Sequence, residues 1–236
     1  MTKLKTLSII IPALNEVNNL EILVSEINKS LKKIIFEIII IDDNSKDGTY
    51  SVLSKLKKKN QHLRFYIRKE NPDLSQSCQL GFRKSKFNNI IVMDADLQHD
   101  PRYLPRMISL FFLKKLDFLI AVRNFTKEFK KQPRFIVSFI LSKIINFLLG
   151  YKTSDPMSGF FIFKKSIYFR NKKKLYGFGF KILFDLLYSG KEFLQIKNFT
   201  IKFKNRKHHQ SKMNYKILYT LIKMIFYFFI KRFFKF

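Results

Sequence analysis

Two aspartates and a glutamine follow one of the most apolar runs of the sequence, in IIVMDADLQHDP at residues 90–101. If the extended conformation continues through this run, Asp94, Asp96 and Gln98 point to the same side, because alternate residues of a strand do so. Two carboxylates and an amide oxygen are hard ligands that suit Mg²⁺ or Mn²⁺. The spacing therefore predicts a metal site that opposes the charge of a departing diphosphate. Because D-x-D is short, a pair of carboxylates capping the next helix explains the motif equally well.

The preceding and following segments predict the elements that position these aspartates. Apolar runs alternate along the chain with segments that carry apolar residues at helical spacing. This alternation is typical of an α/β fold, a Rossmann-like, mostly parallel sheet with helices on both faces. The expected strands lie within residues 6–12, 36–43, 63–69, 88–96 and 118–123, and the expected helices within residues 16–33, 49–56, 75–85 and 103–115.

Polar residues stand at the ends of these runs. Open α/β sheets bind ligands at the carboxyl ends of their strands. Here those ends carry Asn15–Glu16, Asp42–Asp43, Asp94–Asp96 and Arg123, so we expect them to share one crevice. Neither G-x-G-x-x-G nor G-x-x-x-x-G-K-[ST] occurs, which leaves a dinucleotide fold and a P-loop unsupported.

Composition limits the class of protein further. The 236 residues include 47% hydrophobic residues, enough for the core of one large domain. A net charge of +29 favours an anionic partner, although the abundance of Lys, Ile, Asn and Phe indicates that part of it is compositional bias. After Glu192 there is no carboxylate, while residues 193–236 carry eleven Lys or Arg. Cys78 is the single cysteine, which fits a reducing compartment, and the first residues do not read as a signal peptide.

Two later segments are expected to form amphipathic helices. Residues 134–150 are almost wholly apolar apart from polar residues spaced four apart, which fits a core helix or a helix lying in a membrane interface. Near the end of the chain, the apolar stretch 217–230 is interrupted by Lys223 and extends about 21 Å as a helix, short of a hydrocarbon core of ~30 Å. An in-plane membrane anchor is therefore favoured over a membrane span, with a packing helix or a subunit contact as the alternative.

Six motifs together resemble family 2 glycosyltransferases of the GT-A fold, and among them the dolichyl- or polyprenyl-phosphate mannose synthases. They occur in family order over most of the chain. They are IIIPALNE (9–16), IIDDNSKDGT (40–49), VMDADLQHDP (92–101), SDPMSGFF (154–161), GFKILFDLL (179–187) and FKNRKHHQSKM (203–213). The resemblance implies a GT-A catalytic domain over residues 1–205, and a basic loop with an amphipathic membrane-interface helix over residues 206–236.

The resemblance also implies roles for individual residues. Asp94, Asp96 and Gln98 would hold Mg²⁺ or Mn²⁺, and Asp96, Arg123 and Arg206 would take part in catalysis. Arg123 and Arg134 would face the phosphate of a lipid acceptor. Asp43 would accept a hydrogen bond from a base N–H, although it also suits a turn or helix cap. The residues expected to bind the nucleotide-sugar donor are Pro12, Leu14, Glu16, Ile41, Asp43, Asp94, Ala95, Asp96, Gln98, Lys181, Arg206 and Lys212.

The sequence departs from the family pattern at two places. Relatives carry a glycine-leucine pair near NPDLS, residues 71–75, and a glycine where His209 stands. These departures bear on the choice of sugar and acceptor more than on the type of reaction. The multi-helix membrane domain fused to some relatives does not occur in this sequence.

The chemistry of the acceptor suggests a mechanism without a protein base. A lipid monophosphate has a second pKa near ~6 and is already an anionic nucleophile at neutral pH. Arg123 and Arg134 would hold it, and its oxygen would displace the nucleoside diphosphate directly at the anomeric carbon, with inversion. Asp155 is the alternative candidate for a base, although pairing with an arginine or ordering its loop suits it better.

The leading hypothesis is transfer of mannose from GDP-mannose to a polyprenyl phosphate at the cytoplasmic face of a membrane. A small membrane partner subunit is compatible with this hypothesis. A rival keeps the fold but uses a UDP-sugar to transfer glucose or an aminosugar. A non-catalytic nucleic-acid- or lipid-binding protein would fit the charge, but strands apolar on both faces argue against nucleic acid. A silent scaffold subunit would be expected to lack a D-x-D residue, and both are present.

Overall fold

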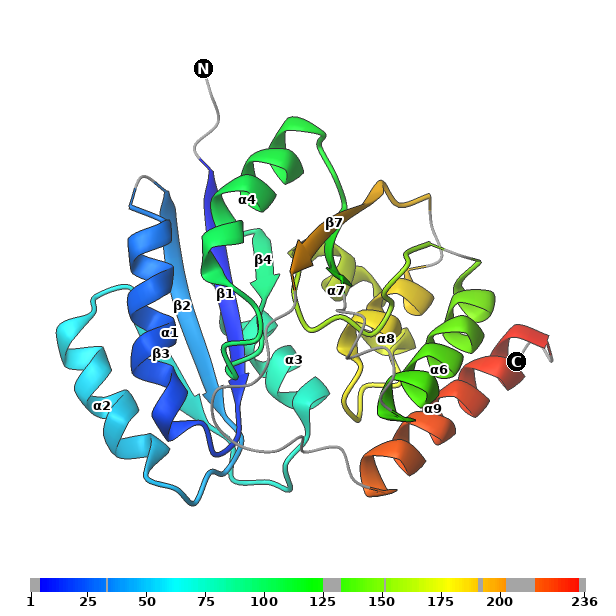
Figure 1. The fold of residues 1–236 in the computed structure, drawn as a ribbon, viewed down its shortest axis with the longest axis horizontal. Helices are drawn as coiled ribbons and strands as arrows, with labels where there is room; N and C mark the ends of the chain where they lie inside the picture. Colours follow the sequence, from blue (N-terminus) through cyan, green and yellow to red (C-terminus); the bar gives the residue numbers. More distant parts are fainter. Residues whose placement is uncertain are drawn as a thin grey trace.

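The computed structural model describes residues 5–32, 34–124, 133–150, 152–190, 193–202 and 215–233, with the backbone alone for residues 133–138 and 215–217. Its described strands form a seven-stranded sheet in the order β3-β2-β1-β4-β6-β5-β7 (Figure 1). The strands are β1 (Thr6–Ala13), β2 (Ile35–Asp42), β3 (Leu63–Ile67), β4 (Asn89–Val92), β5 (Phe118–Asn124), β6 (Phe161–Lys164) and β7 (Ile196–Lys202).

The sheet is mostly parallel. Strands β1 to β4 pair in parallel, as do β5 and β7, whereas β6 runs antiparallel to both of its neighbours, β4 and β5. All five expected strands occur, although the fourth ends at Val92 rather than continuing to residue 96, and β6 and β7 were not expected. The first strand continues through Pro12 to Ala13 rather than ending at the proline.

Helices cover both faces of the sheet. They are α1 (Val17–Ser30), α2 (Thr49–Lys59), α3 (Leu74–Lys84), α4 (Leu104–Leu113), α6 (Pro133–Leu149), α7 (Lys165–Asn171), α8 (Ile182–Ser189) and α9 (Tyr215–Phe233), with short 3₁₀ turns η1 (Pro101–Tyr103) and η2 (Lys172–Lys174). The apolar side chains of α1, α2 and α4 share one core cluster, and those of α3, α6, α7, α8 and α9 share the other. The expected α/β class is confirmed.

The strand sequences explain why both faces are covered. In β2, Ile38 and Ile40 lie in the first core cluster, whereas Ile39 and Ile41 lie in the second. All four side chains are fully buried, and each contributes about 1.5–3 kcal/mol of stabilisation. A run such as residues 38–41, apolar at every position, is stable between two layers, and most polar residues then lie towards the ends of the strand.

Close contact between α3 and the sheet depends on a glycine. A Cβ at Gly81 would lie 2.3 Å from Cγ2 of Ile10, so any side chain there would push α3 away from β1. The middle of β1 and the later part of α3 are thereby kept in close contact.

Helices α6 and α9 lie side by side at one edge of the molecule (Figure 1). Ile145 and Leu148 of α6 and Met224 and Phe228 of α9 are buried in the second core cluster. Arg232 donates from Nη1 to the carbonyl of Phe147 at 2.9 Å and to that of Leu148, which satisfies carbonyls at the last turn of α6. The two helices therefore pack on the second core cluster and on each other.

The outward sides of the two helices remain apolar. None of the helices in the described part of the chain has both the length and the hydropathy needed to cross a bilayer. The placement of the outward side in a membrane stays a prediction. The large apolar residues exposed there are Phe139, Ile140, Ile144 and Phe147 of α6, with Tyr219, Ile222, Phe226, Tyr227, Phe229 and Phe233 of α9.

Candidate active site

Loops at the carboxyl ends of β1 and β2 are bonded to each other. The Asn15 N–H donates to Ser45 Oγ at 2.7 Å, and the Val17 N–H donates to Asp47 Oδ2 at 3.0 Å. Across the strands themselves, the Asp43 N–H donates to the carbonyl of Ala13 at 2.8 Å. The expectation that polar strand ends share one edge is thus met for these two strands.

Asp94 follows β4 and faces the loop that leads into β6. A Cβ at Gly159 would lie 2.1 Å from Asp94 Oδ2 and 2.5 Å from its Oδ1, so the carboxylate occupies space that any other residue at 159 would fill. His99, almost fully buried, has its Nδ1 3.6 Å from Asp94 Oδ2 and packs against the ring of Phe160. The Asp94 side chain retains 33% exposure, so it lies at the floor of the site rather than in the core.

The chain turns between Asp94 and Gln98. Strand β4 ends at Val92, and Leu97 has a φ of +61°, in the left-handed region. The Gln98 N–H donates to Asp96 Oδ1 at 3.1 Å, which places residues 96–98 in a tight turn. The premise of a continuing strand was therefore wrong, and any convergence of the three side chains depends on this turn; the metal assignment of Asp94, Asp96 and Gln98 stays a prediction.

The aspartates nevertheless fit a divalent ion. Among the described residues no group of three or more His, Cys, Asp or Glu side chains forms a self-sufficient metal site. Mg²⁺ and Mn²⁺ are commonly held by one or two carboxylates and completed by water and substrate phosphates. Asp94 and Asp96 offer that number of carboxylates, and the glycine at 159 leaves the first of them room.

Arg123, at the end of β5, is fixed by a carboxylate. Its Nε lies 2.6 Å from Asp155 Oδ2 and its Nη2 lies 2.8 Å from Asp155 Oδ1, a two-bond ion pair. Burial opposes the charge of Arg123, but Asp155 and, more weakly, Asp94 outweigh it and raise the pKa of the guanidinium. The expectation that Asp155 pairs with an arginine is confirmed.

Lys181 joins this group from the residue that precedes α8. Burial and the charge of Arg123 lower the pKa of its ammonium, while Asp94 and Asp155 act in the opposite direction. The charges of Asp94, Arg123, Asp155 and Lys181 thus act on one another, although the residues come from four different segments of the sequence. Two cations within a site attract anionic ligands.

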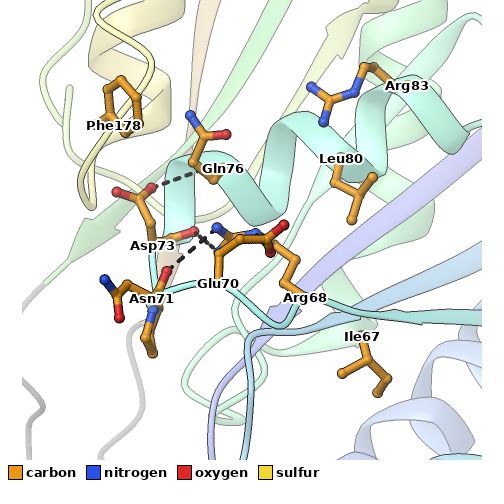
Figure 2. A pocket seen from close by; sticks show the side chains of 10 residues that line it. Ile67, Arg68, Glu70, Asn71, Asp73, Gln76, Leu80, Arg83 and Phe178 are labelled. Atoms are coloured by element: carbon orange, nitrogen blue, oxygen red, sulfur yellow. Dashed lines mark hydrogen bonds and ion pairs between the residues drawn. The ribbon is translucent and has the colours of Figure 1, made fainter.

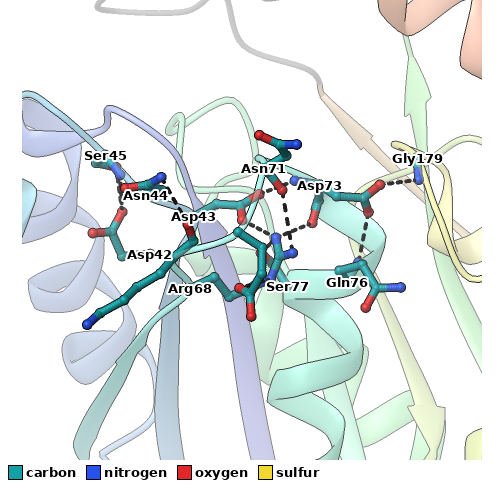
Figure 3. A network of polar contacts seen from close by, with 12 residues as sticks. Asp42, Asp43, Asn44, Ser45, Arg68, Asn71, Asp73, Gln76, Ser77 and Gly179 are labelled. Atoms are coloured by element: carbon teal, nitrogen blue, oxygen red, sulfur yellow. Dashed lines mark hydrogen bonds and ion pairs between the residues drawn. The ribbon is translucent and has the colours of Figure 1, made fainter.

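A second polar network lies beyond the end of β2 (Figure 3). Asp43 forms a buried ion pair with Arg68, and its Oδ2 accepts the Asp73 N–H at 2.6 Å. Burial raises the pKa of Asp43, although Arg68 and these hydrogen bonds lower it. The carboxylate proposed to accept from a base N–H therefore already has two intramolecular donors, and a base would have to use its remaining lone pairs.

A cavity of about 490 Å³ adjoins this network (Figure 2). Arg68 and Asp73 line it beside the first turns of α3, and the half-exposed Phe178 reaches it from the loop before α8. Its other lining residues are Ile67, Glu70, Asn71, Pro72, Gln76, Leu80 and Arg83. The cavity is open and has a mixed polar and apolar lining, and three of its lining residues, Gln76, Leu80 and Arg83, lie on α3.

The remaining predicted residues are buried, half-buried or outside the described part of the chain. Ile41 is fully buried in β2, between Pro12 of β1 and Tyr66 of β3. Glu16 is buried and accepts from Asn19 Nδ2 at 2.6 Å. Pro12 and Ala95 are also buried and Leu14 is half-buried. Arg206 and Lys212 lie outside the described residues, as does the side chain of Arg134, whose backbone belongs to the first turn of α6.

Three residues of the site were missed from the sequence. Arg68 follows β3 just as Arg123 occurs at the end of β5, so the rule of strand ends would have found it. Gly159 and His99 lie inside motifs that were recognised, but no spacing rule predicts their contacts with Asp94.

Comparison with known sequences defines the class of protein. The pattern of the Glycosyl transferase family 2 matches residues 8–169, and the chain belongs to that family. It is 31% identical over 232 residues to a protein of Mycosarcoma maydis named dolichol-phosphate mannosyltransferase, covering 92% of this chain and 77% of that protein. It is 30% identical over 230 residues to a protein of the same name from Pyrococcus furiosus, covering 93% of this chain and 62% of the relative. The expected family is confirmed, and the chain is a glycosyltransferase.

Solved structures confirm the fold class. Glucosyl-3-phosphoglycerate synthase from Mycobacterium tuberculosis, crystallised with Mn²⁺, UDP and glucosyl-3-phosphoglycerate, superimposes with a TM-score of 0.69 at 14% identity, covering 97% of this chain and 80% of that one. Mannosyl-3-phosphoglycerate synthase from Rubrobacter xylanophilus gives a TM-score of 0.69 at 15% identity, covering 96% and 73%. At these identities the likeness concerns the fold alone.

The contact between Gly159 and Asp94 yields the first prediction. We expect Gly159→Ala to displace the Asp94 carboxylate and to raise the Mn²⁺ concentration needed for half-maximal activity by about ten- to hundredfold. Gly81→Ala is the matched control, because it also introduces a methyl group into a tight contact, but against Ile10. The assignment of Asp94 to the metal fails if both variants show the same metal requirement as the parent chain.

Proposed function

We propose that this chain transfers mannose from GDP-mannose to a polyprenyl phosphate of the dolichyl type. The observation that carries the proposal is the two-bond ion pair that fixes Arg123 against Asp155 at the end of β5, where the charge of Asp94 also acts on Arg123 and Lys181. The relatives named dolichol-phosphate mannosyltransferase, which align with nearly the whole chain, support this choice of substrates.

Asp94, Asp96 and Gln98 are the residues assigned to Mg²⁺ or Mn²⁺. A bound ion would neutralise charge on the diphosphate as it departs. The Mn²⁺ and UDP named for the fold neighbour support a divalent metal cofactor in general. We also assign Arg206 and Lys212 to the diphosphate and Arg134 to the acceptor phosphate.

The acceptor phosphate oxygen would attack the anomeric carbon directly, while the bond from that carbon to the diphosphate oxygen breaks and GDP leaves. The product has the inverted configuration. A phosphate nucleophile is already deprotonated at neutral pH, so no protein base is required. Asp155 suits a positioning role, because both of its carboxylate oxygens lie against Arg123.

A donor panel tests the proposed substrates. With a short polyprenyl phosphate and Mn²⁺, GDP-mannose should give lipid-linked mannose, and EDTA should abolish the reaction until a divalent ion is restored. The alternative reading, a UDP-dependent glucosyl- or aminosugar transferase, rests on the UDP found in the fold neighbour. Turnover of UDP-glucose in preference to GDP-mannose would establish that alternative, and full activity in EDTA would contradict the metal assignment.

The role of Arg123 can be tested by a change that keeps its charge. Arg123→Lys loses the planar fork, so we expect activity to fall at least about tenfold, mainly through a higher acceptor KM. Arg102→Lys is the matched control, since Arg102 makes a similar pair with Asp100 but is mostly exposed.

The absence of a protein base is tested at Asp155. Asp155→Asn should lower the activity less than Asp96→Asn does. If a neutral polyprenol reacts as fast as its phosphate and Asp155→Asn abolishes that activity, Asp155 is the base.

We propose that the chain associates peripherally with the cytoplasmic face of a membrane, and that a small membrane partner subunit is compatible with the same surface. The outward apolar sides of α6 and α9, flanked by Lys231 and Arg232 in the last turn of α9, support an interfacial position for residues 206–236 beside the catalytic domain of residues 1–205.

Liposome flotation tests this association. Phe226, 62% exposed on α9, should enter the interface, so Phe226→Glu should weaken binding to anionic liposomes by about tenfold. The matched control is Leu113→Glu, which places the same charge on α4, whose apolar side belongs to the other core cluster. Equal binding by both variants, or no binding by the parent chain at low salt, would contradict the membrane-interface assignment.

A further inference from the structure

The loop before α8 is anchored by an unusual number of side chains. We call residues 176–180, with sequence YGFGF, the GFG loop. Gln76 Nε2 and Gln79 Nε2 of α3 each donate to the carbonyl of Gly177 at 2.7 Å. Asp185 of α8 accepts the Tyr176 N–H at 2.9 Å and the Gly177 N–H at 2.8 Å. The first half of the loop is therefore attached both to α3 and to α8.

The second half of the GFG loop depends on Asp73. The Gly179 N–H donates to Asp73 Oδ2 at 2.7 Å, and the Gly179 carbonyl accepts the Ser75 N–H at 2.9 Å. Gly179 has a φ of +93°, a conformation that a side chain would strain, so the position of its N–H is well defined by the backbone. Two residues later the chain reaches Lys181.

Asp73 also connects this loop to the donor side of the site (Figure 3). Its backbone N–H donates to Asp43, its carbonyl accepts from Arg68 at 3.3 Å, and its Oδ1 accepts the Gln76 N–H at 2.9 Å as the N-cap of α3. One residue thus contacts the end of β2, the start of α3 and the loop that leads to Lys181. These contacts use different atoms of Asp73, so they can be separated by substitution.

We propose that Asp73 is a positioning residue for glycosyl transfer, which sets the place of Lys181 beside Asp94 and Arg123 by fixing Gly179. The inference rests on the proposed function of the Lys181 cluster. Asp73 itself contacts neither the donor nor the acceptor in this proposal. A substitution of Asp73 should change turnover only because it changes the position of Lys181.

Asp73→Asn is expected to remove the contact of Asp73 with the GFG loop while keeping its contacts with the end of β2 and the start of α3. Asparagine is as good an N-cap as aspartate and keeps the backbone bonds to Asp43 and Arg68, but a single amide oxygen cannot serve both Gln76 and Gly179. We expect kcat to fall about ten- to hundredfold, with the Kd for GDP and Mn²⁺ nearly unchanged. Because Asp73 acts through Lys181, the double variant with Lys181→Gln should be no slower than Lys181→Gln alone.

Asp117→Asn is the matched control. Asp117 likewise accepts a backbone N–H from another segment, that of Gln195 at 2.9 Å, but it lies at the opposite end of β5 from Arg123. We expect it to lower the thermal midpoint about as much as Asp73→Asn does while leaving kcat close to that of the parent chain. If Asp73→Asn does not fold, Asp73→Ser keeps a capping oxygen and tests the same loop contact.

Hydrogen exchange supplies a measurement that needs no substrate. Faster exchange of residues 177–181 in Asp73→Asn, with α3 unchanged, is expected. Unchanged exchange in this loop, or additive losses of kcat in the double variant, would overturn the inference. A parent chain that is inactive with every donor would instead count against the proposed function, and the exchange result would still decide the role of Asp73.

Discussion

A sheet that is apolar on both faces has nowhere but its strand ends to place polar groups. Burying a charged or unpaired polar side chain between the layers would cost several kcal/mol. Strand β1 accordingly carries no carboxylate, and the buried Glu37 near the start of β2 accepts a hydrogen bond from Ser8 and pairs with Arg64, so the remaining carboxylates follow where the chain leaves the sheet. In a parallel arrangement those exits lie on one edge. The site of this protein follows from that constraint, since Asp43, Arg68, Asp94 and Arg123 come from the ends of four different strands.

The charges at this edge are organised in pairs. A chain with a net charge of +29 could bind anions almost anywhere on its surface, yet the described site contains carboxylates matched to cations: Asp43 with Arg68 and Asp155 with Arg123. A pair of this kind fixes the direction of the guanidinium, which matters more for positioning a phosphate than another unpaired lysine would. The GFG loop adds Lys181 to the group at a place set by α3, α8 and Asp73.

Much of this arrangement could be predicted from the sequence. Solid apolar runs specify buried parallel strands by themselves, and strand ends specify where the polar residues gather. The antiparallel strand β6 could not be predicted in this way, because its four residues, Phe161–Lys164, form a strand by pairing with β4 and β5 on either side. The extended path from Asp94 to Gln98 was wrong because the left-handed Leu97 turns the chain, and leucine gives no local signal for such a conformation. Contacts such as Gly159 with Asp94, or Asp73 with Gly179, depend on packing between distant segments.

The central proposal for this site is that the aspartates after β4 hold a divalent ion against a nucleoside diphosphate. Electron paramagnetic resonance of Mn²⁺ measures this directly, since the sharp signal of the free ion disappears on binding. The account predicts that the chain with GDP removes more Mn²⁺ from the free signal than GDP alone does, and that Asp94→Asn combined with Asp96→Asn abolishes the difference. Equal Mn²⁺ binding by the parent chain and the double variant would contradict it.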